Sequence, residues 1–357
     1  MTQPYKTTSN RGILYALSAA LLFGISAPAA KFLLLSAPPQ LLAGIFYLGS
    51  GFGLFFIMLW RTLRNQNKSQ EASLQGQDWS WLALATLFGG ILGPVLLMSG
   101  LLRTDAASAS LLLNLEGALT AALAWFVFRE HYDKRIVVGM IFIVAGGLLI
   151  SWAGSPSWQS FLGPLFIAAA CLCWAIDNNV TRQISASDPL QITFIKSVVA
   201  GAINLILALS FGSQMPRLSL LTLMGLTGFF GYGLSLYCFV LALRHIGSSR
   251  TGAYFSLAPF IGAIISLFFL GGTITWQLAI AAALMAIGIV LHLSENHDHE
   301  HTHDELEHEH KHVHDEHHRH QHSANDPIGE PHSHWHRHDP LTHKHPHYPD
   351  IHHRHGH

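Results

Sequence analysis

Ten apolar segments, each about 20 residues long, follow one another through the first 293 residues of this 357-residue chain. A helix of about 20 apolar residues is long enough to cross the hydrocarbon core of a bilayer. Half of all residues are hydrophobic and only 11% are charged, which excludes an ordinary soluble domain. We therefore predict an all-α integral membrane protein with ten transmembrane helices. The predicted spans are 12–34, 40–60, 80–102, 105–128, 135–153, 161–182, 190–211, 218–243, 251–271 and 276–293.

The apolar region contains an internal duplication. One constant offset aligns Leu115 with Leu257, and a second aligns Gly12 with Gly163. A cleaved signal peptide would need no internal copy, so residues 12–34 are predicted to remain as the first span. A unit of five helices crosses the membrane an odd number of times, and its copy must then enter from the opposite side. We predict two inverted five-helix repeats.

Four regions follow from this pattern. They are an N-terminal segment at 1–11, a first repeat at 12–153, a second repeat at 161–293 and a tail at 294–357. Short cytoplasmic loops are enriched in Lys and Arg. With the N-terminus inside, the inner segments hold Lys6, Arg11, Arg61, Arg64, Lys68, Arg129, Lys134, Arg135, Arg182, Arg244 and Arg250, and the outer ones hold Lys31, Arg103 and Arg217. Both termini are therefore predicted to be cytoplasmic, in a bacterial inner membrane.

Glycine and proline interrupt the third and the eighth span. Inverted-repeat carriers place the substrate site near the membrane midplane, at interrupted helices in corresponding positions of the two repeats. Close helix packing would also favour small residues here, and both interpretations stay open. The interrupting residues are Gly89, Gly90, Gly93 and Pro94 in the third span and Gly225, Gly228, Gly231 and Gly233 in the eighth.

Glu116 is an acidic residue about eleven positions from either end of its predicted span, near the midplane at 1.5 Å per residue. An ionisable side chain at this depth costs about 2–3 kcal/mol on insertion scales, and it marks a proton or ion pathway more often than not. The second copy has Ala258 at the corresponding position. We predict that Glu116 couples transport to protons or cations; a protonated, purely structural Glu116 is the alternative.

Two further ionisable residues, Asp177 and Lys196, lie at similar depths in spans six and seven. They could pair as a gate, or each could reach independently toward water. Asn178 and Asn204 could line the same path or bridge neighbouring helices. Cys171 and the other two cysteines fall in apolar spans, which favours buried thiols over a disulfide.

These patterns together resemble the drug/metabolite transporter superfamily, specifically the ten-helix permeases with two EamA-type repeats. The motifs that carry the resemblance are GILYALSAALLFG at 12–24 with Lys31, ASASLLLNLE at 107–116, Arg129-Glu130, and Leu257-Ala258-Pro259 in the second copy. The first copy has Gly117 where the family often has proline, so the sequence leaves it open whether this helix is kinked. The resemblance implies an exporter of an amino acid, metabolite or drug-like solute, and it leaves the substrate unnamed.

The tail from Ser294 differs in composition and holds 23 of the 26 histidines. It has too few apolar residues to form a core, so we predict a disordered segment. Neutral imidazoles beside carboxylates suit Zn²⁺, Ni²⁺, Co²⁺ or Cu²⁺, bound at several overlapping weak sites. The predicted ligands are His297, His299, His301, His303, His308, His310, His312, His314, His332, His334, His336 and His338.

The sequence therefore predicts a secondary-active carrier of a small organic solute, with the bilayer as its environment and no required cofactor. One alternative is a transition-metal carrier whose tail buffers metal, and another is a membrane metal sensor without transport activity. The sequence contains no HExxH, P-loop or GxSxG motif, which argues against an enzyme. No nucleic-acid partner is expected, and the oligomeric state is left open.

Overall fold

The computed structural model describes residues 6–63, 74, 76, 78–127, 134–152, 158–184, 187–293, 297–303, 306–312, 332–338 and 341–347. Up to residue 293 the described residues form helices and the turns between them. The first half contains α1 (Lys6–Leu33), α2 (Pro39–Leu63), α3 (Asp78–Ala85), η2 (Thr86–Leu92), α4 (Gly93–Arg103), α5 (Ala106–Leu112), α6 (Leu115–Phe126) and α7 (Lys134–Ser151). The segment η2 is a π-helix that continues α3 into α4.

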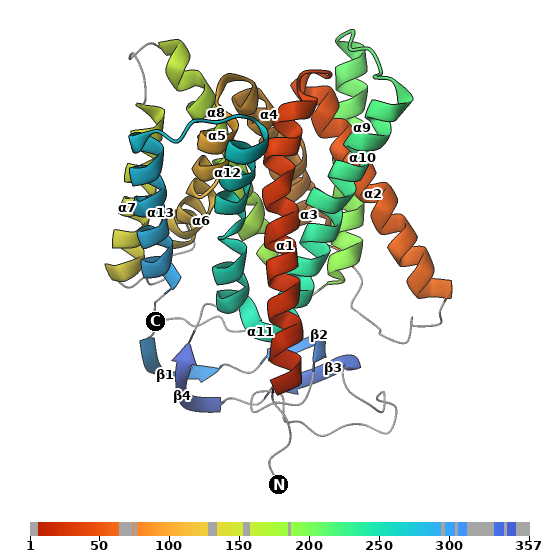
Figure 1. Ribbon diagram of the computed structural model, residues 1–357. Coiled ribbons are helices and arrows are strands. Elements are labelled where there is room, and N and C mark those ends of the chain that lie inside the picture. The colour runs from red at the N-terminus through yellow and green to blue at the C-terminus, as the bar shows by residue number, and fades with distance from the viewer. Residues whose placement is uncertain are drawn as a thin grey trace.

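The second half repeats this order. It contains α8 (Trp158–Arg182), α9 (Pro189–Ser210), α10 (Leu218–Gly228), η3 (Phe229–Leu234), α11 (Ser235–Phe255), α12 (Ala258–Phe269) and α13 (Trp276–Leu293), where η3 is again a π-helix. The helices stand side by side as one bundle, and α1 begins at the same end of it at which α13 finishes (Figure 1).

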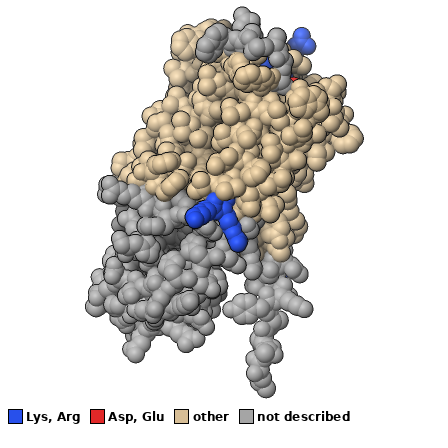
Figure 2. Space-filling model, turned by 90° about the vertical axis from the view of Figure 1, so that its left-hand side faces the viewer, with Lys and Arg blue, Asp and Glu red and all other residues tan. Residues whose placement is uncertain are grey.

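The helices of this bundle are long and apolar. Eight helical stretches between Arg11 and Ala242 meet the length and hydropathy needed to cross a membrane, and two shorter apolar helices follow at Ala258–Phe269 and Trp276–Leu291. Figure 2 shows one face of the molecule, on which the charged side chains of the described residues lie toward the two ends and leave a belt without charged residues between them. Such a belt matches the hydrocarbon layer of a bilayer. The protein is an integral membrane protein.

Polar residues and glycines mark the helix limits. The side chain of Asp105 accepts a hydrogen bond from the backbone N–H of Ser108 and so caps α5, and Asp188 caps α9 in the same way, just before Pro189. Gly212 has a φ of 82°, a backbone conformation that glycine adopts without strain, and it ends α9. These caps satisfy backbone groups that a bilayer cannot hydrate.

Two predicted helix limits differ from the structure. The predicted span 105–128 is interrupted at Leu113 and Asn114. The predicted turn at 244–250 is helical instead, because α11 continues to Phe255 and the interruption follows at 256–257. The basic and polar residues of 244–250 suggested a loop, but the segment contains no proline that would end a helix. The charged segment around Arg129 and Glu130 lies outside the described residues.

The two halves pack against each other reciprocally. In one direction, α1 packs against α11 and α12, and in the other, α8 packs against α4 and α6. The helices α2 and α9 pack along each other, as do α7 and α13. The first helix of each half therefore contacts the third and fourth spans of the other half.

Single contacts between α2 and α9 repeat this reciprocity. A β-carbon on Gly51 would lie 2.8 Å from the Val198 side chain, and one on Gly201 would lie 2.7 Å from the backbone nitrogen of Leu48. Both pairs are related by one offset, since 51 + 150 = 201 and 48 + 150 = 198. Only glycine allows the two helices to approach this closely at these places.

The hydrophobic core is concentrated toward one end of the bundle, where α1 meets α2 and α4 meets α5. We call this the α1–α2 end. Its large and fully buried side chains are Leu33, Leu41, Leu42, Phe46, Leu97, Met98, Leu101, Leu111 and Leu112. The opposite end, where α8 meets α9, has a smaller apolar cluster around Leu82, Ile184 and Ile192. The α1–α2 end is therefore closed by tight apolar packing.

The tail differs from the predicted disordered segment. Its described residues form the strands β1 (His297–His303), β2 (Leu306–His312), β3 (His332–His338) and β4 (Leu341–His347). The strand β1 pairs with β4 and β2 pairs with β3, both antiparallel. In Figure 1 these strands lie beyond the end of the bundle at which α13 finishes. The alternating His-x-His pattern has the period of a strand, and backbone pairing needs no apolar core residue.

Candidate functional site

The two π-helical segments lie at corresponding places in the two halves. Adding 142, the offset that relates Leu115 to Leu257, to the limits of η2 gives 228–234, and η3 covers Phe229–Leu234. π-Helical turns inside α-helices often mark functional sites. The predicted glycines lie in these segments or beside them: Gly89 and Gly90 in η2, Gly93 and Pro94 at the start of α4, Gly228 at the end of α10, and Gly231 and Gly233 in η3.

Gly89 is the residue of η2 with the most polar surroundings. Its carbonyl oxygen accepts hydrogen bonds from the Tyr47 hydroxyl at 2.8 Å and from the Trp174 indole nitrogen at 3.1 Å. A β-carbon on Gly89 would overlap the carboxylate of Asp177. The close approach of α8 therefore requires glycine at this position. A glycine here is compatible with both interpretations left open by the sequence, an interrupted helix at a substrate site and close helix packing.

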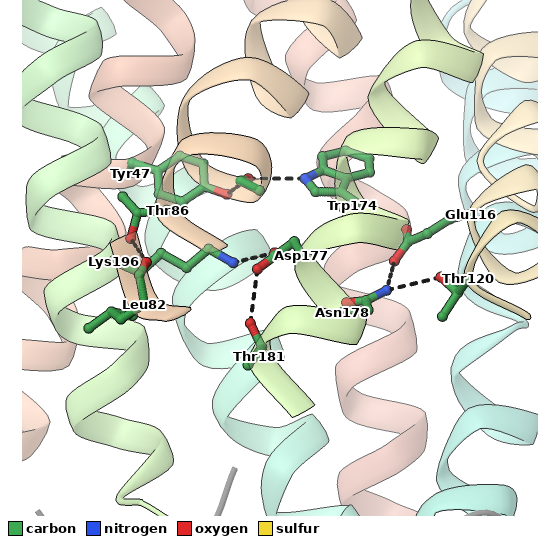
Figure 3. A network of polar contacts seen from close by, with 11 residues as sticks. Tyr47, Leu82, Thr86, Glu116, Thr120, Trp174, Asp177, Asn178, Thr181 and Lys196 are labelled. Carbon is green, nitrogen blue, oxygen red and sulfur yellow. Dashed lines mark hydrogen bonds and ion pairs between the residues drawn. The ribbon is translucent and has the colours of Figure 1, made fainter. Parts of the chain in front are cut away.

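Asp177 and Lys196 form an ion pair between α8 and α9 (Figure 3). The Thr181 hydroxyl donates a further hydrogen bond of 2.9 Å to the Asp177 carboxylate. Both charged side chains are largely buried, with exposed fractions of 9% for Asp177 and 12% for Lys196. Of the two interpretations left open by the sequence, the structure shows the paired one.

Glu116 lies at the break between α5 and α6. The Asn114 side chain donates to the Leu111 carbonyl at 3.0 Å, and the Cys171 thiol lies 3.7 Å from the Leu112 carbonyl. The Cys171 thiol meets a carbonyl that the break frees, and the Asn114 side chain adds to the bond that its own backbone N–H makes with the Leu111 carbonyl. The interruption thus forms although Gly117 replaces the proline frequent in the family. In the second half, Pro259 follows the corresponding break at 256–257.

The break places Glu116 in the first turn of α6. The N-terminal end of a helix carries a partial positive charge that stabilises a carboxylate. The Asn178 side chain donates 2.8 Å to the Glu116 carboxylate, and it lies 3.4 Å from the Thr120 hydroxyl (Figure 3). Glu116 is partly exposed, whereas Asn178 is exposed.

The exposed residue Asn178 lies on the face of α8 that points into the bundle. Successive residues of a helix differ by about 100°, which places Asn178 about 120° away from the exposed Leu172. The fully buried Ala175 lies between them on the helix surface. Asn178 also faces α6 through its bond to Glu116. The amide of Asn178 is therefore accessible beside the Glu116 carboxylate, on the side of the bundle away from the closed α1–α2 end.

Asn204 has one of the two settings that the sequence left open. It is fully buried, and its side-chain nitrogen donates to the Gly90 carbonyl at 3.1 Å. Its side-chain oxygen has no hydrogen-bond partner among the described residues. Asn204 thus bridges α9 to η2, which favours the helix-bridging interpretation over a direct place on the path.

The pseudo-equivalent positions of the two halves differ in charge. A β-carbon on Gly231 would lie 2.6 Å from the Ser26 side chain, just as one on Gly89 would meet Asp177. Gly231 corresponds to Gly89 at the offset of 142, and Asp177 corresponds to Ser26 at the offset of 151. Serine thus stands in the first half where the second half has an acid, so the Asp177–Lys196 ion pair belongs to the second half only.

Sequence reasoning missed four residues of this network: Tyr47, Thr120, Trp174 and Thr181. The signal that could have found two of them is helical spacing, because Trp174, Asp177, Asn178 and Thr181 stand at i, i+3, i+4 and i+7 on one face of α8. Trp174 also corresponds to Phe23 in the repeat, and their rings pack edge to face at 6.4 Å. Tyr47 carries no such signal in a span rich in aromatic residues.

In the part of the membrane body that the structure describes, metal-binding side chains do not gather. Among the residues whose side chains the structure describes, no three His, Cys, Asp or Glu residues form a group that could hold a metal ion. In the tail the strand register places histidines opposite one another. The cross-strand partners are His297 with His347, His299 with His345, His301 with His343, His308 with His336, His310 with His334 and His312 with His332. His343, His345 and His347 were not among the predicted ligands, and His314 lies outside the described residues.

Comparison with known proteins gives a consistent result. Residues 10–152 and 161–294 each match the EamA-like transporter family. An uncharacterized transporter of Methanothermobacter thermautotrophicus is 29% identical over 294 residues, which covers 78% of this chain and 85% of that protein. The uncharacterized transporter YyaM of Bacillus subtilis is 28% identical over 232 residues, covering 62% of this chain and 75% of YyaM.

A shorter relative matches part of the chain. The protein named "Probable 4-amino-4-deoxy-L-arabinose-phosphoundecaprenol flippase subunit ArnE" of Pseudomonas fluorescens is 33% identical over 111 residues, which covers 31% of this chain and 91% of that protein. One solved crystal structure matches with a TM-score of 0.59 at 19% identity, over 78% of this chain and 94% of that chain. That likeness concerns the fold.

Proposed function

Because this chain belongs to the EamA-like transporter family of the drug/metabolite transporter superfamily, we propose that it is a secondary-active carrier of a small organic solute. The observation that carries the proposal is the placement of Glu116. Its carboxylate stands at the N-terminal end of a half-helix, is bonded to the accessible Asn178, and lies where the two halves of the chain meet. Interrupted helices at such an interface are typical of carrier sites.

Alternating access between two inverted repeats is the proposed transport cycle. The reciprocal packing of α1 on α11 and of α8 on α4 supports it, as do the matching positions of η2 and η3. In the present arrangement the α1–α2 end is closed by its apolar core, and the space beside Asn178 is accessible. A relative movement of the halves would close that space and open the α1–α2 end.

Glu116 is the proposed coupling residue. Burial in a bilayer favours the neutral acid, whereas the helix end and Asn178 favour the carboxylate, so the balance can change with the accessibility of the site. A group poised in this way can take up a proton on one side of the membrane and release it on the other. The Asp177 and Lys196 pair is the proposed gate on the side of α8 and α9, because it joins the two helices beside the accessible space.

Export is the proposed direction. The partial relative ArnE is named as a flippase subunit, which supports movement of a solute out of the cytoplasm. The excess of basic residues in loops at the end where α1 begins supports a cytoplasmic position for that end and for both termini. A bacterial inner membrane is the proposed location. The accessible space would then face the cytoplasm and be ready to accept a solute.

Solute flux in proteoliposomes tests the proposed function. Purified protein is reconstituted at defined orientation, and a panel of radiolabelled amino acids, sugars and organic cations is tested for counterflow under an imposed pH gradient. A carrier moves at least one solute class faster than protein-free liposomes do, and the gradient stimulates that flux. A protein that moves none of the panel, with or without the gradient, would contradict the proposal.

We further propose that the tail binds transition metal ions, independently of the transported solute. The strand register supports this, because six histidine pairs stand at opposite positions in two antiparallel ladders. Directly opposite residues of such ladders have β-carbons about 4.5–5.5 Å apart on the same face, within reach of one shared ion. Neutral imidazole binds Zn²⁺, Ni²⁺, Co²⁺ and Cu²⁺.

A further inference from the structure

A proline determines which carbonyl groups of η2 lack a backbone partner. Pro94 has no N–H, and it follows Gly90 by four residues and Gly89 by five. Residue 94 would be the donor to the Gly90 carbonyl in an α-helix and to the Gly89 carbonyl in a π-helix. The N–H of Gly93 already donates to the Phe88 carbonyl. The Gly89 carbonyl therefore has neither backbone donor and depends on other helices, and the Gly90 carbonyl lacks its α-helical donor.

Three side chains supply these donors, and they come from different halves of the chain. Tyr47 of α2 and Trp174 of α8 share the Gly89 carbonyl, and Asn204 of α9 binds the Gly90 carbonyl. Figure 3 shows Tyr47 and Trp174 approaching this carbonyl from opposite sides. Tyr47 belongs to the same half as η2, whereas Trp174 belongs to the other half. Only the Trp174 bond links the Gly89 carbonyl across the interface between the halves.

The second half does not reproduce this arrangement. The residue corresponding to Pro94 is Leu236, since 94 + 142 = 236, and leucine keeps its backbone N–H. The segment η3 therefore retains the donor that η2 lacks. Its glycines make steric contacts, such as Gly231 against the Ser26 side chain. The carbonyl of Gly89 is thus a feature of one half, created by one proline.

We propose that Trp174 and Tyr47 are positioning residues. They set which end of the carrier is open through their hydrogen bonds to the Gly89 carbonyl. This inference rests on the proposed alternating access. In the present arrangement both donors bind the carbonyl, and the Trp174 bond holds the halves together with the α1–α2 end closed. When the halves move apart, Trp174 leaves, and Tyr47 stays with η2 as the remaining partner of the carbonyl.

The two donors therefore have opposite effects on the equilibrium between the two arrangements. Removing the Trp174 N–H weakens only the present arrangement, so the α1–α2 end opens more often. Removing the Tyr47 hydroxyl leaves the carbonyl without a partner only in the other arrangement, so the α1–α2 end opens less often. One net hydrogen bond corresponds to a change of about fivefold in such an equilibrium.

Spin-label distances across the α1–α2 end test this inference. Labels are attached at Leu35→Cys and Phe211→Cys, which lie at that end in different halves and are 82% and 78% exposed. Cys171, Cys173 and Cys238 are replaced by alanine in every variant. Trp174→Phe should raise the population with the longer distance about fivefold. Trp125→Phe is the matched control, because this tryptophan is 37% exposed and stacks on Phe126 away from η2, and it should change nothing.

Tyr47→Phe should lower the same population, and in the Trp174→Phe background it should have no effect, because the carbonyl then has the same partners in both arrangements. The inference is overturned if Trp174→Phe matches the Trp125→Phe control, or if Tyr47→Phe shifts the population in the same direction as Trp174→Phe. No solute is needed for these measurements. A protein that switches as expected but moves no solute would contradict the proposed function and leave this inference standing.

Discussion

Asp177 and Ser26 occupy equivalent places in the two halves, each against a glycine of the opposite π-helical segment. Because one place holds an acid and the other a hydroxyl, only the second half of this approximately symmetric bundle has an ion pair at this position. Asp177 also pairs with Lys196, and the residue of the first half that corresponds to Lys196 at the offset of 150 is Phe46. The consequences of this asymmetry can be measured.

The first prediction concerns the ion pair between Asp177 and Lys196. Asp177→Asn leaves a largely buried lysine without its carboxylate, which should destabilise the protein by about 3–5 kcal/mol. Adding Lys196→Met removes the unpaired charge and should recover most of the lost stability. Thermal unfolding in detergent, followed by the exposure of buried tryptophan, gives both values. Equal destabilisation by the single and the double substitution would contradict a coupled pair.

The second prediction concerns Gly89. Gly89→Ala places a methyl group on the Asp177 carboxylate, so η2 and α8 must separate and the variant should lose stability and transport. Gly225→Ala is the matched control, since a β-carbon there meets no atom within 4 Å. It should be neutral or slightly stabilising, because alanine favours a helix over glycine by about 1 kcal/mol. Comparable losses in the two variants would argue against a special approach at Gly89.

The helices and the acid in the membrane could be predicted from the sequence because their signals are periodic or rare. Long apolar segments defined most spans, and Glu116 was conspicuous as a charge far from any loop. The pairing of Asp177 with Lys196 was one of two open interpretations, because sequence gives the depth of each residue and not the direction of its side chain. The α11 extension was missed, since polar residues beyond the apolar layer look the same in a helix and in a loop.

The two side-chain hydrogen bonds to the Gly89 carbonyl could not be predicted in this way. Pro94 indicates that nearby carbonyls lack a donor, but it does not indicate which side chains supply one. Tyr47 and Trp174 come from helices that are far apart in the sequence and meet only because the halves pack reciprocally. The register of the tail strands could not be predicted for the same reason, because β1 pairs with β4, which lies far from it in the sequence.

The third prediction concerns the histidines of the tail. If one metal ion is shared by each cross-strand pair, removing His310 and its partner His334 together should lose the same single ion as removing either alone. Removing His310 and His345, which belong to different pairs, should lose two ions. Calorimetric titration with Zn²⁺ measures the number bound, and binding should weaken below about pH 6.5 as the imidazoles take up protons.

Truncation after Leu293 is the control for this titration, and it should abolish the binding while leaving solute flux unchanged. A loss of ions that depended only on the number of histidines removed would contradict the pairing and favour overlapping weak sites. Full-length protein that binds no more metal than the truncated form would contradict metal binding by the tail altogether.

The fourth prediction concerns orientation. Alkaline phosphatase fused after Leu293 is active only if this point lies outside the cytoplasm, so the fusion should be inactive in a bacterial host. A fusion in the turn between α9 and α10, after Gly212, should be active, because this turn lies at the opposite end of the bundle from the end of α13. Activity of the Leu293 fusion would reverse the proposed orientation and the proposed direction of access.

The fifth prediction concerns Glu116, the proposed coupling residue. Glu116→Gln keeps the size of the side chain and can still meet Asn178 and Thr120, but it carries no titratable proton. Folding should therefore be retained, as should exchange of solute across the membrane without a gradient. Flux driven by a pH gradient should fall to the level of protein-free liposomes, since the variant cannot convert proton movement into solute movement.

The most direct test of a proton-coupled carrier is the simultaneous recording of solute flux and internal pH in one proteoliposome preparation, for the wild-type protein and for Glu116→Gln. The account predicts that wild-type protein moves protons whenever solute is added on one side, and that Glu116→Gln exchanges solute without moving protons. Proton movement coupled to solute in Glu116→Gln, at the wild-type ratio, would contradict it.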